Sequence, residues 1–161
     1  MILTIDCGNT RLKWGMHDGT GWCAQGPLDY ADLPGFAELL RAQPRAEKAV
    51  AANVAGPQVG EAVAAAVTAL GIPLHWAKSQ SVQYGVRNHY ERPEQLGVDR
   101  WAALVGARAL HPQACLVVCA GTATTVDVMD AEGGFQGGLI LPGAALMRRA
   151  LAANTAQLPL A

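Results

Sequence analysis

The stretch "DCGNTRLK" (Asp6–Lys13) follows directly after a short apolar run near the start of the chain. An acid at the exit of an apolar strand is costly to bury unless a cation or hydrogen-bond donors meet it. Phosphate-transfer chemistry uses such an acid to hold magnesium or its bound waters. Asp6 is therefore a candidate for Mg²⁺ binding, although an aspartate that caps a turn gives the same pattern.

A similar layout returns at residues 116–129, "LVVCAGTATTVDVM". When Gly8 is aligned with Gly121, each glycine follows an apolar strand and precedes small hydroxyl residues and a second strand. Short turns of this kind leave backbone N–H groups facing an anion, and Thr10 and Thr122 add hydroxyl donors. The two stretches are predicted to be phosphate-binding hairpins of one nucleotide site.

Lys13 has two interpretations. On a strand it points to the opposite face from Thr10, unless twist or a bulge redirects it. A lysine at this place can meet a terminal phosphate, whereas a solvated strand lysine is the interpretation that spacing alone favours. Neither G-x-x-x-x-G-K-[ST] nor G-x-G-x-x-G occurs in the chain, so a P-loop or Rossmann site is not supported.

Strands and helices are expected to alternate along the chain, which indicates an α/β architecture. The helix over 97–110 is expected to turn Trp101, Leu104, Val105 and Ala109 inward, and the polar segment 79–95 is expected to be irregular. The predicted strands are 2–6, 10–17, 22–25, 49–54, 74–77, 116–119, 123–129 and 135–141, and the predicted helices are 32–41, 58–70, 97–110 and 144–153.

Composition excludes several classes of function. The formal net charge is −1, which gives no basic surface for nucleic acid and no polybasic patch for a membrane. No apolar stretch reaches the roughly 18 residues of a spanning helix, and no signal peptide is recognised, so a cytoplasmic protein is expected. The four cysteines match no zinc or C-x-x-C spacing and are expected to be free thiols.

Two further stretches complete a family pattern: "NHYERPEQLGVDRWAALVGA" (Asn88–Ala107) and "GGLILPGAALMRRALAANTAQLP" (Gly137–Pro159). Together with the two hairpins, in this order and spacing, they resemble type III pantothenate kinases. The resemblance implies an actin-like ATPase fold, as in acetate and sugar kinases, Hsp70 and actin. It implies two ribonuclease H-like lobes, 1–113 and 114–161, the second incomplete.

The resemblance also implies an activity. Enzymes of this family use ATP with Mg²⁺ to phosphorylate pantothenate to 4'-phosphopantothenate, the first step of coenzyme A biosynthesis, usually as homodimers. The implied ATP-binding residues are Asp6, Cys7, Gly8, Asn9, Thr10, Arg11, Leu12, Lys13 and Thr122. The implied pantothenate-binding residues are Tyr90, Gly97, Val98, Asp99 and Arg100, with Asp99 as the general base for the substrate hydroxyl.

Residue chemistry agrees with the roles implied for Arg100 and Asp99. The carboxylate of pantothenate suits an arginine, which can offer two parallel donors. An acid at a helix start is favoured in its ionised form, and in phosphoryl transfer the base mainly orients the nucleophile. Without the resemblance, Asp99-Arg100 is more simply a helix-start cap with a surface charge, and Tyr90 an ordinary half-buried tyrosine.

The sequence departs from the family pattern in one residue and in length. Many members carry an aspartate at the position of Cys119, where it helps to bind a monovalent cation. A thiol is a poor ligand for potassium, so dependence on K⁺ or NH₄⁺ is in doubt; Asp127 is a weak alternative oxygen ligand. Because family members continue well beyond "NTAQLP", weak or absent activity is expected for these 161 residues alone.

Two other functions fit part of the pattern. One is a different phosphotransferase or phosphatase of the same superfamily, against which the segment 90–100 argues. The other is a non-catalytic accessory or regulatory protein that keeps the fold. Retention of Asp6, Asp99 and Arg100 argues against a purely structural role.

Overall fold

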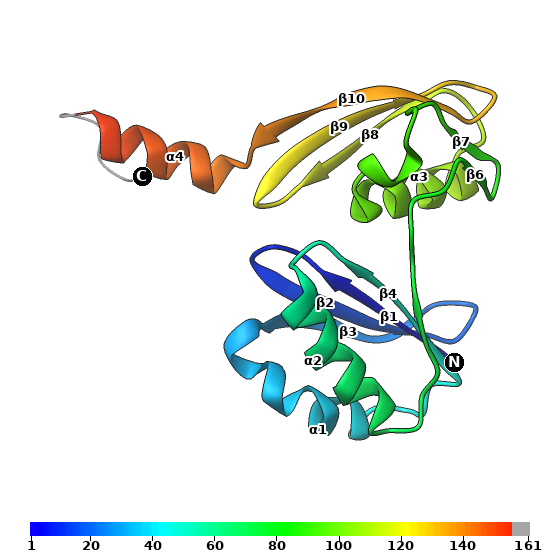
Figure 1. Ribbon diagram of the computed structural model, residues 1–161, viewed down its shortest axis with the longest axis vertical. Helices are drawn as coiled ribbons and strands as arrows, with labels where there is room; N and C mark the ends of the chain where they lie inside the picture. Colours follow the sequence, from blue (N-terminus) through cyan, green and yellow to red (C-terminus); the bar gives the residue numbers. More distant parts are fainter. Residues whose placement is uncertain (156–161) are drawn as a thin grey trace. The chain divides into compact units, whose positions relative to one another are not determined.

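The computed structural model describes residues 1–155, so the last part of the family-like stretch, 156–159, lies outside the described residues. The chain forms two compact units, Met1–Lys78 and a second that begins at Ser79 (Figure 1). This boundary lies earlier than the sequence-based boundary between 113 and 114. The reason is that helix α3 (Val98–Leu110) packs on strands β8 (Cys115–Ala120) and β9 (Ala123–Met129), which draws residues 79–113 into the second unit.

The first unit is a mixed five-stranded sheet in the order β3-β2-β1-β4-β5. The first three strands form an antiparallel meander, and the last two run parallel to β1. The strands are β1 (Ile2–Cys7), β2 (Arg11–His17), β3 (Trp22–Asp29), β4 (Lys48–Asn53) and β5 (Leu74–Trp76). The connecting helices are η1 (Tyr30–Gly35), α1 (Phe36–Arg41) and α2 (Pro57–Thr68).

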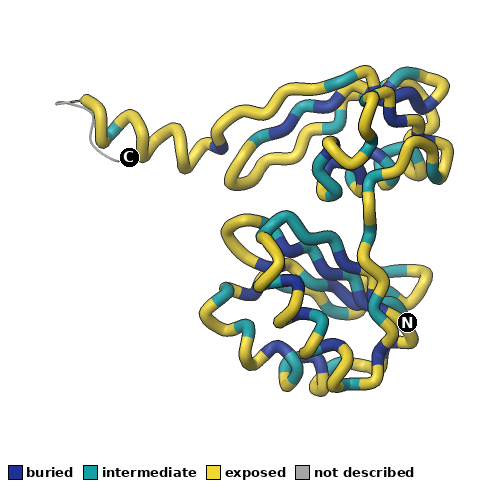
Figure 2. Tube along the Cα trace, in the orientation of Figure 1, coloured by how far each residue is buried: buried dark blue, intermediate teal, exposed yellow. Residues whose placement is uncertain are grey.

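Strict alternation along β1 fixes how this sheet faces its helices. Leu3, Ile5 and Cys7 are buried with Phe36 of α1 and Val63 of α2, as Figure 2 shows by the dark bands on β1. Each fully buried side chain of this kind contributes about 1.5–3 kcal/mol. A slip of one residue in the register would expose all three, so the register of β1 is strongly determined. Asp6 consequently lies on the opposite face of the sheet, where it stays partly exposed.

The prediction of a helix over 32–41 is only half correct. Residues Tyr30–Gly35 form a 3-10 helix that contains Pro34, and the α-helix starts at Phe36. Proline lacks the N–H that an α-helical hydrogen bond needs, and Gly35 adds backbone freedom, so the tighter and shorter helix forms first. The helix predicted over 58–70 is α2, which starts one residue earlier, with Pro57 at its first position, and ends at Thr68.

The second unit contains a five-stranded sheet in the order β6-β7-β10-β9-β8. The segment 79–95, predicted to be irregular, contributes two short strands, and β7 pairs in parallel with β10. Ala109 of α3, predicted to face inward, is exposed, whereas Trp101 and Leu104 are buried as expected. The remaining elements are β6 (Val82–Gln83), β7 (Val86–Asn88), η2 (Pro93–Gln95), β10 (Gly134–Pro142) and α4 (Ala144–Asn154).

The second sheet repeats the alternation of the first, but one of its faces is uncovered. Leu116 and Val118 of β8 occupy the places of Leu3 and Ile5 in the aligned hairpins, and Leu139 of β10 lies on the same face through its register with β9. Leu3 is 0% exposed, whereas Leu116 is 64% and Leu139 is 63% exposed. The described residues therefore leave an apolar sheet face in solvent, larger than single scattered apolar residues would make.

We expect this apolar face to make the purified 161-residue chain associate at micromolar concentration. Replacing Val118 and Leu139 together by lysine should restore a monodisperse chain and reduce binding of a hydrophobic dye, with little change in melting temperature because both side chains are exposed. Light scattering and dye fluorescence provide the measurement. Leu110→Lys, which changes an exposed leucine of α3, is the control, and an equal effect of that variant would contradict the assignment.

Candidate active site

The β1–β2 hairpin places an acid and a base opposite each other. Asp6 and Lys13 are register partners, and Lys13 Nζ lies 3.5 Å from Asp6 Oδ2. Both side chains are well exposed, so the pair contributes little to stability and can open toward a ligand. Lys13 therefore shares a face with Asp6 and keeps most of its side chain in solvent.

The turn of this hairpin is fixed from both sides. Tyr30 Oη donates a hydrogen bond to the carbonyl of Gly8, and the Val54 N–H donates to the carbonyl of Cys7 at 3.0 Å. Burial, followed by the nearby charges of Cys7 and Asp6, raises the pKa of Tyr30 to about 12, so its hydroxyl keeps the donated proton at neutral pH. The carbonyl groups of the turn are thus engaged by the protein, and its exposed rim consists of Asn9, Thr10 and Arg11.

The second hairpin repeats the antiparallel pairing of the first with a shorter turn and without the charged pair. Cys119 pairs with Thr125 in the register that Asp6 and Lys13 occupy in the first hairpin. Cys119 is an exposed free thiol, and no group of three or more His, Cys, Asp or Glu side chains that could hold a metal ion is found among residues 1–155.

Helix α4 begins on the turn of the second hairpin. The Gly143 N–H donates to the carbonyl of Thr122 at 2.9 Å. A Cβ atom on Gly143 would lie 2.0 Å from the carbonyl oxygen of Gly121. Because that contact is with backbone, only glycine permits the approach, and the Gly121–Thr122 turn and the start of α4 form one local structure.

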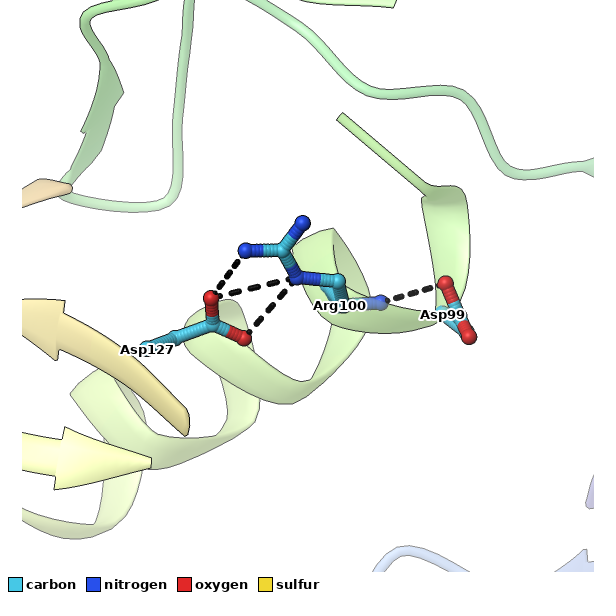
Figure 3. Close-up of polar contacts among 3 residues, drawn as sticks. All are labelled: Asp99, Arg100 and Asp127. Atoms are coloured by element: carbon cyan, nitrogen blue, oxygen red, sulfur yellow. Dashed lines mark hydrogen bonds and ion pairs between the residues drawn. The ribbon is translucent and has the colours of Figure 1, made fainter. Parts of the chain in front are cut away.

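The first turn of α3 presents Asp99 to solvent. Asp99 Oδ1 accepts a hydrogen bond from the Arg100 N–H at 2.8 Å (Figure 3). Gly97 precedes the helix and accepts the first helical hydrogen bond from the Trp101 N–H at 3.0 Å. A Cβ atom on Gly97 would lie 2.6 Å from Asp99 Oδ1, so glycine is needed there for this orientation of the carboxylate.

Arg100 points the other way, into the unit. It is 7% exposed, and its Nε lies 3.1 and 3.2 Å from the two carboxylate oxygens of Asp127, which is 0% exposed. Its Nη2 also donates to Asp127 Oδ1. The hydrogen bond to Asp127 raises the pKa of Arg100 against the opposing effect of burial, and the charge of Asp127 adds to the increase.

Two interpretations from the sequence need correction here. The interpretation of Arg100 as a surface charge beside a helix cap is wrong, because its side chain is buried against β9. Asp127 is not available as an alternative oxygen ligand for a cation, because both of its oxygens accept from Arg100. Nε and Nη2 of Arg100 are thus engaged by Asp127 (Figure 3), and Tyr90 interacts with the same side chain.

Tyr90 joins the same cluster. Its ring lies 5.4 Å from the ring of Phe135, and Arg100 Cζ lies 5.7 Å from the Phe135 centroid. Asn88 holds the loop in place: its Oδ1 accepts from the Tyr90 N–H, and its Nδ2 donates to the carbonyl of Pro93, both at 3.1 Å. The structure therefore brings Tyr90 and Arg100 together around Phe135, with Asp99 beside Arg100 in the chain; the family resemblance groups these three residues.

Three members of this cluster were missed by the sequence-based reasoning: Asn88, Phe135 and the role of Asp127. A signal for Asp127 was available, because alternation in "TTVDVM" puts it on the same face as Thr125 and Met129. An acid on the buried face of a strand requires a cation or hydrogen-bond donors beside it. Nothing local, however, identifies Arg100 as that partner.

Comparison with solved structures defines the class of protein. A putative 2-dehydro-3-deoxygalactonokinase from Sinorhizobium meliloti matches 97% of this chain and 58% of its own length, with a TM-score of 0.55 and 13% identity. The ethanolamine utilization protein EutJ from Carboxydothermus hydrogenoformans matches 98% of this chain and 57% of its own, with a TM-score of 0.54 and 17% identity. The chain has the actin-like ATPase fold, as expected from the sequence.

Sequence comparison gives the family. The family model described as type III pantothenate kinase matches residues 2–161, and the chain belongs to that family. Type III pantothenate kinases from Aromatoleum aromaticum and Bordetella pertussis are 55% identical over 161 residues and 45% identical over 170 residues, each covering 100% of this chain. The chain spans 66% and 64% of these two relatives, about two thirds of their length. No helix among the described residues is long and apolar enough to span a membrane.

We expect the cysteine of the first hairpin to be unreactive in the native chain. Burial, followed by the charge of Asp6, raises the pKa of Cys7 to about 11. At pH 8 only about one thiol in a thousand would then be ionised, since each pKa unit is a factor of ten. Reaction with a chromogenic disulfide should lose a fast phase in Cys119→Ala and lose none in Cys7→Ala. A missing fast phase in Cys7→Ala would contradict the burial of that thiol.

Proposed function

We propose that this chain carries the ATP-binding hairpins and the pantothenate-binding segment of a type III pantothenate kinase, which phosphorylates pantothenate to 4'-phosphopantothenate. The observation that carries the proposal is the exposed carboxylate of Asp99 on the first turn of α3, beside Arg100 and near Tyr90. All three residues lie in the family-like stretch Asn88–Ala107. The chain spans about two thirds of its relatives, so the proposal concerns the parts of the enzyme that lie in these residues.

ATP is assigned to the two hairpins. In the first, Asp6 supplies the carboxylate oxygens that suit Mg²⁺ or its waters, and Lys13 supplies a cation for a terminal phosphate once its exposed pairing with Asp6 opens. The segment from Cys7 through Leu12 supplies the turn and its backbone, and Thr122 supplies a contact from the second hairpin. Bound Mg²⁺ would neutralise charge on the phosphate oxygens during transfer.

Pantothenate is assigned to the start of α3. Asp99 accepts the hydrogen bond of the substrate's primary hydroxyl and takes its proton as the oxygen attacks the terminal phosphorus of ATP. The bond from that phosphorus to the bridging oxygen breaks, and ADP leaves. Gly97 and Val98 form the wall at the helix start, and Tyr90 offers a ring and a hydroxyl. Arg100 meets the substrate carboxylate as a cation, while its Nε and Nη2 stay bonded to Asp127.

The homodimer follows the family resemblance. The cytoplasmic location and the absence of nucleic-acid and membrane partners follow the composition of the chain. Dependence on a monovalent cation is not part of the proposal, because Cys119 stands where many family members carry an aspartate and pairs with Thr125.

We expect Asp99→Asn to reduce turnover of pantothenate with ATP by about 10²–10⁴-fold, the usual contribution of a positioned general base. The Km for ATP should change less than about threefold, because ATP is assigned to other residues. A coupled assay of ADP formation with pantothenate provides the measurement, in this chain and in a version extended to the length of its relatives.

Asp32→Asn is the control, since it removes an exposed carboxylate from η1 at the same change in charge. Full turnover in Asp99→Asn would exclude Asp99 as the base. Turnover only in the extended version would show that these residues need the rest of the enzyme. Absence of pantothenate-dependent ADP formation in both would refute the proposed reaction.

We expect the turnover to be equal in sodium and potassium buffers. Cys119→Asp should add a hard oxygen ligand at the place where many relatives have an acid, and should make the rate rise with potassium. The comparison is a titration with KCl at constant ionic strength, with Cys119→Asn as the uncharged control. A wild-type rate that already requires potassium would show that other oxygens hold the ion.

A further inference from the structure

Asp127 is a fully buried charge in the middle of β9. Its carboxylate accepts from Arg100 Nε with both oxygens, at 3.1 and 3.2 Å, and from Arg100 Nη2. A buried ion left without its partner is strongly unfavourable, so each of these two side chains fixes the place of the other. Because Arg100 belongs to the first turn of α3, this pair ties the start of the helix to the sheet.

The space for the ion pair is provided by a glycine on the next strand. Gly138 of β10 is the register partner of Asp127. A Cβ atom on Gly138 would lie 2.2 Å from Asp127 Oδ1, 2.5 Å from the carbonyl oxygen of Val126 and 2.9 Å from Arg100 Nη2. The carbonyl belongs to the backbone and cannot turn aside, so even alanine would force the strand or the ion pair to move.

An aromatic ring packs against the guanidinium group of Arg100. Arg100 Cζ lies 5.7 Å from the centroid of Phe135, which is itself 0% exposed. The guanidinium is thus held between a carboxylate, a glycine and a ring face. Asp99, the preceding residue in the chain, carries its carboxylate on the opposite, exposed side and accepts a hydrogen bond from the Arg100 N–H.

We propose that Asp127 and Gly138 are positioning residues. Together they fix Arg100 to β9 and β10, and through Arg100 they fix the first turn of α3 and the carboxylate of Asp99. The catalytic consequence rests on the proposed function, whereas the fixing of the helix start does not.

Hydrogen exchange measured by NMR tests the fixing directly, without any activity. Asp127→Asn and Gly138→Ala should each speed exchange of the Arg100 and Trp101 amides by at least about tenfold, as local opening becomes easier. Exchange in the core of the first unit, at Leu3 and Ile5, should stay unchanged.

Matched controls exist for both changes. Gly106→Ala lies in the same helix, where an added Cβ meets nothing within 4 Å, and Glu132→Gln removes an exposed charge from the second unit. Both should exchange like the wild type. If Asp127→Asn or Gly138→Ala fails to fold, Arg100→Lys replaces it, because lysine keeps the charge against Asp127 but has no planar pair of donors.

Kinetics then separate positioning from mere stability. A loss of folded protein lowers the rate and leaves both Km values unchanged. Positioning instead raises the Km for pantothenate, or lowers kcat per folded molecule, by at least about tenfold in Asp127→Asn and Gly138→Ala, with the Km for ATP unchanged.

Unchanged exchange at the start of α3 in both variants would overturn the proposal. So would faster exchange accompanied by wild-type kcat and Km for pantothenate per folded molecule, which would limit the pair to a structural role. If the wild type itself does not phosphorylate pantothenate, the proposed function fails. In that case the exchange measurement still decides whether Asp127 and Gly138 fix the helix start.

Discussion

The burial of one negative charge organises the second unit. Asp127 lies on the inner face of β9 with no exposed surface, and a carboxylate is stable there only with a cation and several donors around it. That requirement turns Arg100 inward from the first turn of α3 and leaves room only for glycine at position 138. With Arg100 turned inward, the neighbouring Asp99 is left on the outer side of the same turn. The exposed acid that the proposed chemistry needs is thus a consequence of a buried ion pair.

The two hairpins share antiparallel strand pairing but differ in the charges that they carry. The register of β1 and β2 pairs Asp6 with Lys13, and the register of β8 and β9 puts Cys119 and Thr125 at the same places. Both turns contain a glycine, Gly8 and Gly121, and the carbonyl of Gly121 lies against Gly143 at the start of α4. The charged groups suited to magnesium and phosphate are concentrated in the first hairpin, and the second offers a turn and the start of α4.

Sequence periodicity predicted most strands and helices, because alternation of burial along a strand is written in the residue order itself. Periodicity failed where a proline changes the type of helix, or where a residue far away in the sequence determines the local structure. Pro34 turned half of an expected helix into a 3-10 helix, and the short strand β7 exists because β10 pairs with it. The direction of Arg100 was missed for the same reason: its partner lies 27 residues away. The grouping of Tyr90 with Asp99 and Arg100 came from family resemblance, since spacing alone places no side chain across a loop.

The two faces of β9 link the candidate site to the uncovered face of the sheet. Asp127 lies on the inner face, while its neighbours Val126 and Val128 lie on the outer face beside Leu116 and Leu139. In the first unit the equivalent face is packed under α1 and α2, which holds β1 and therefore Asp6 in place. Without an equivalent cover, β9 is held by its strand partners β8 and β10 and by helices α3 and α4 among the described residues. Because a strand opens as a unit, loosening at Val126 and Val128 also loosens Asp127, and the Arg100 contact transmits this to Asp99. Covering the apolar face is therefore a condition for a rigid acid at the start of α3, as well as for solubility.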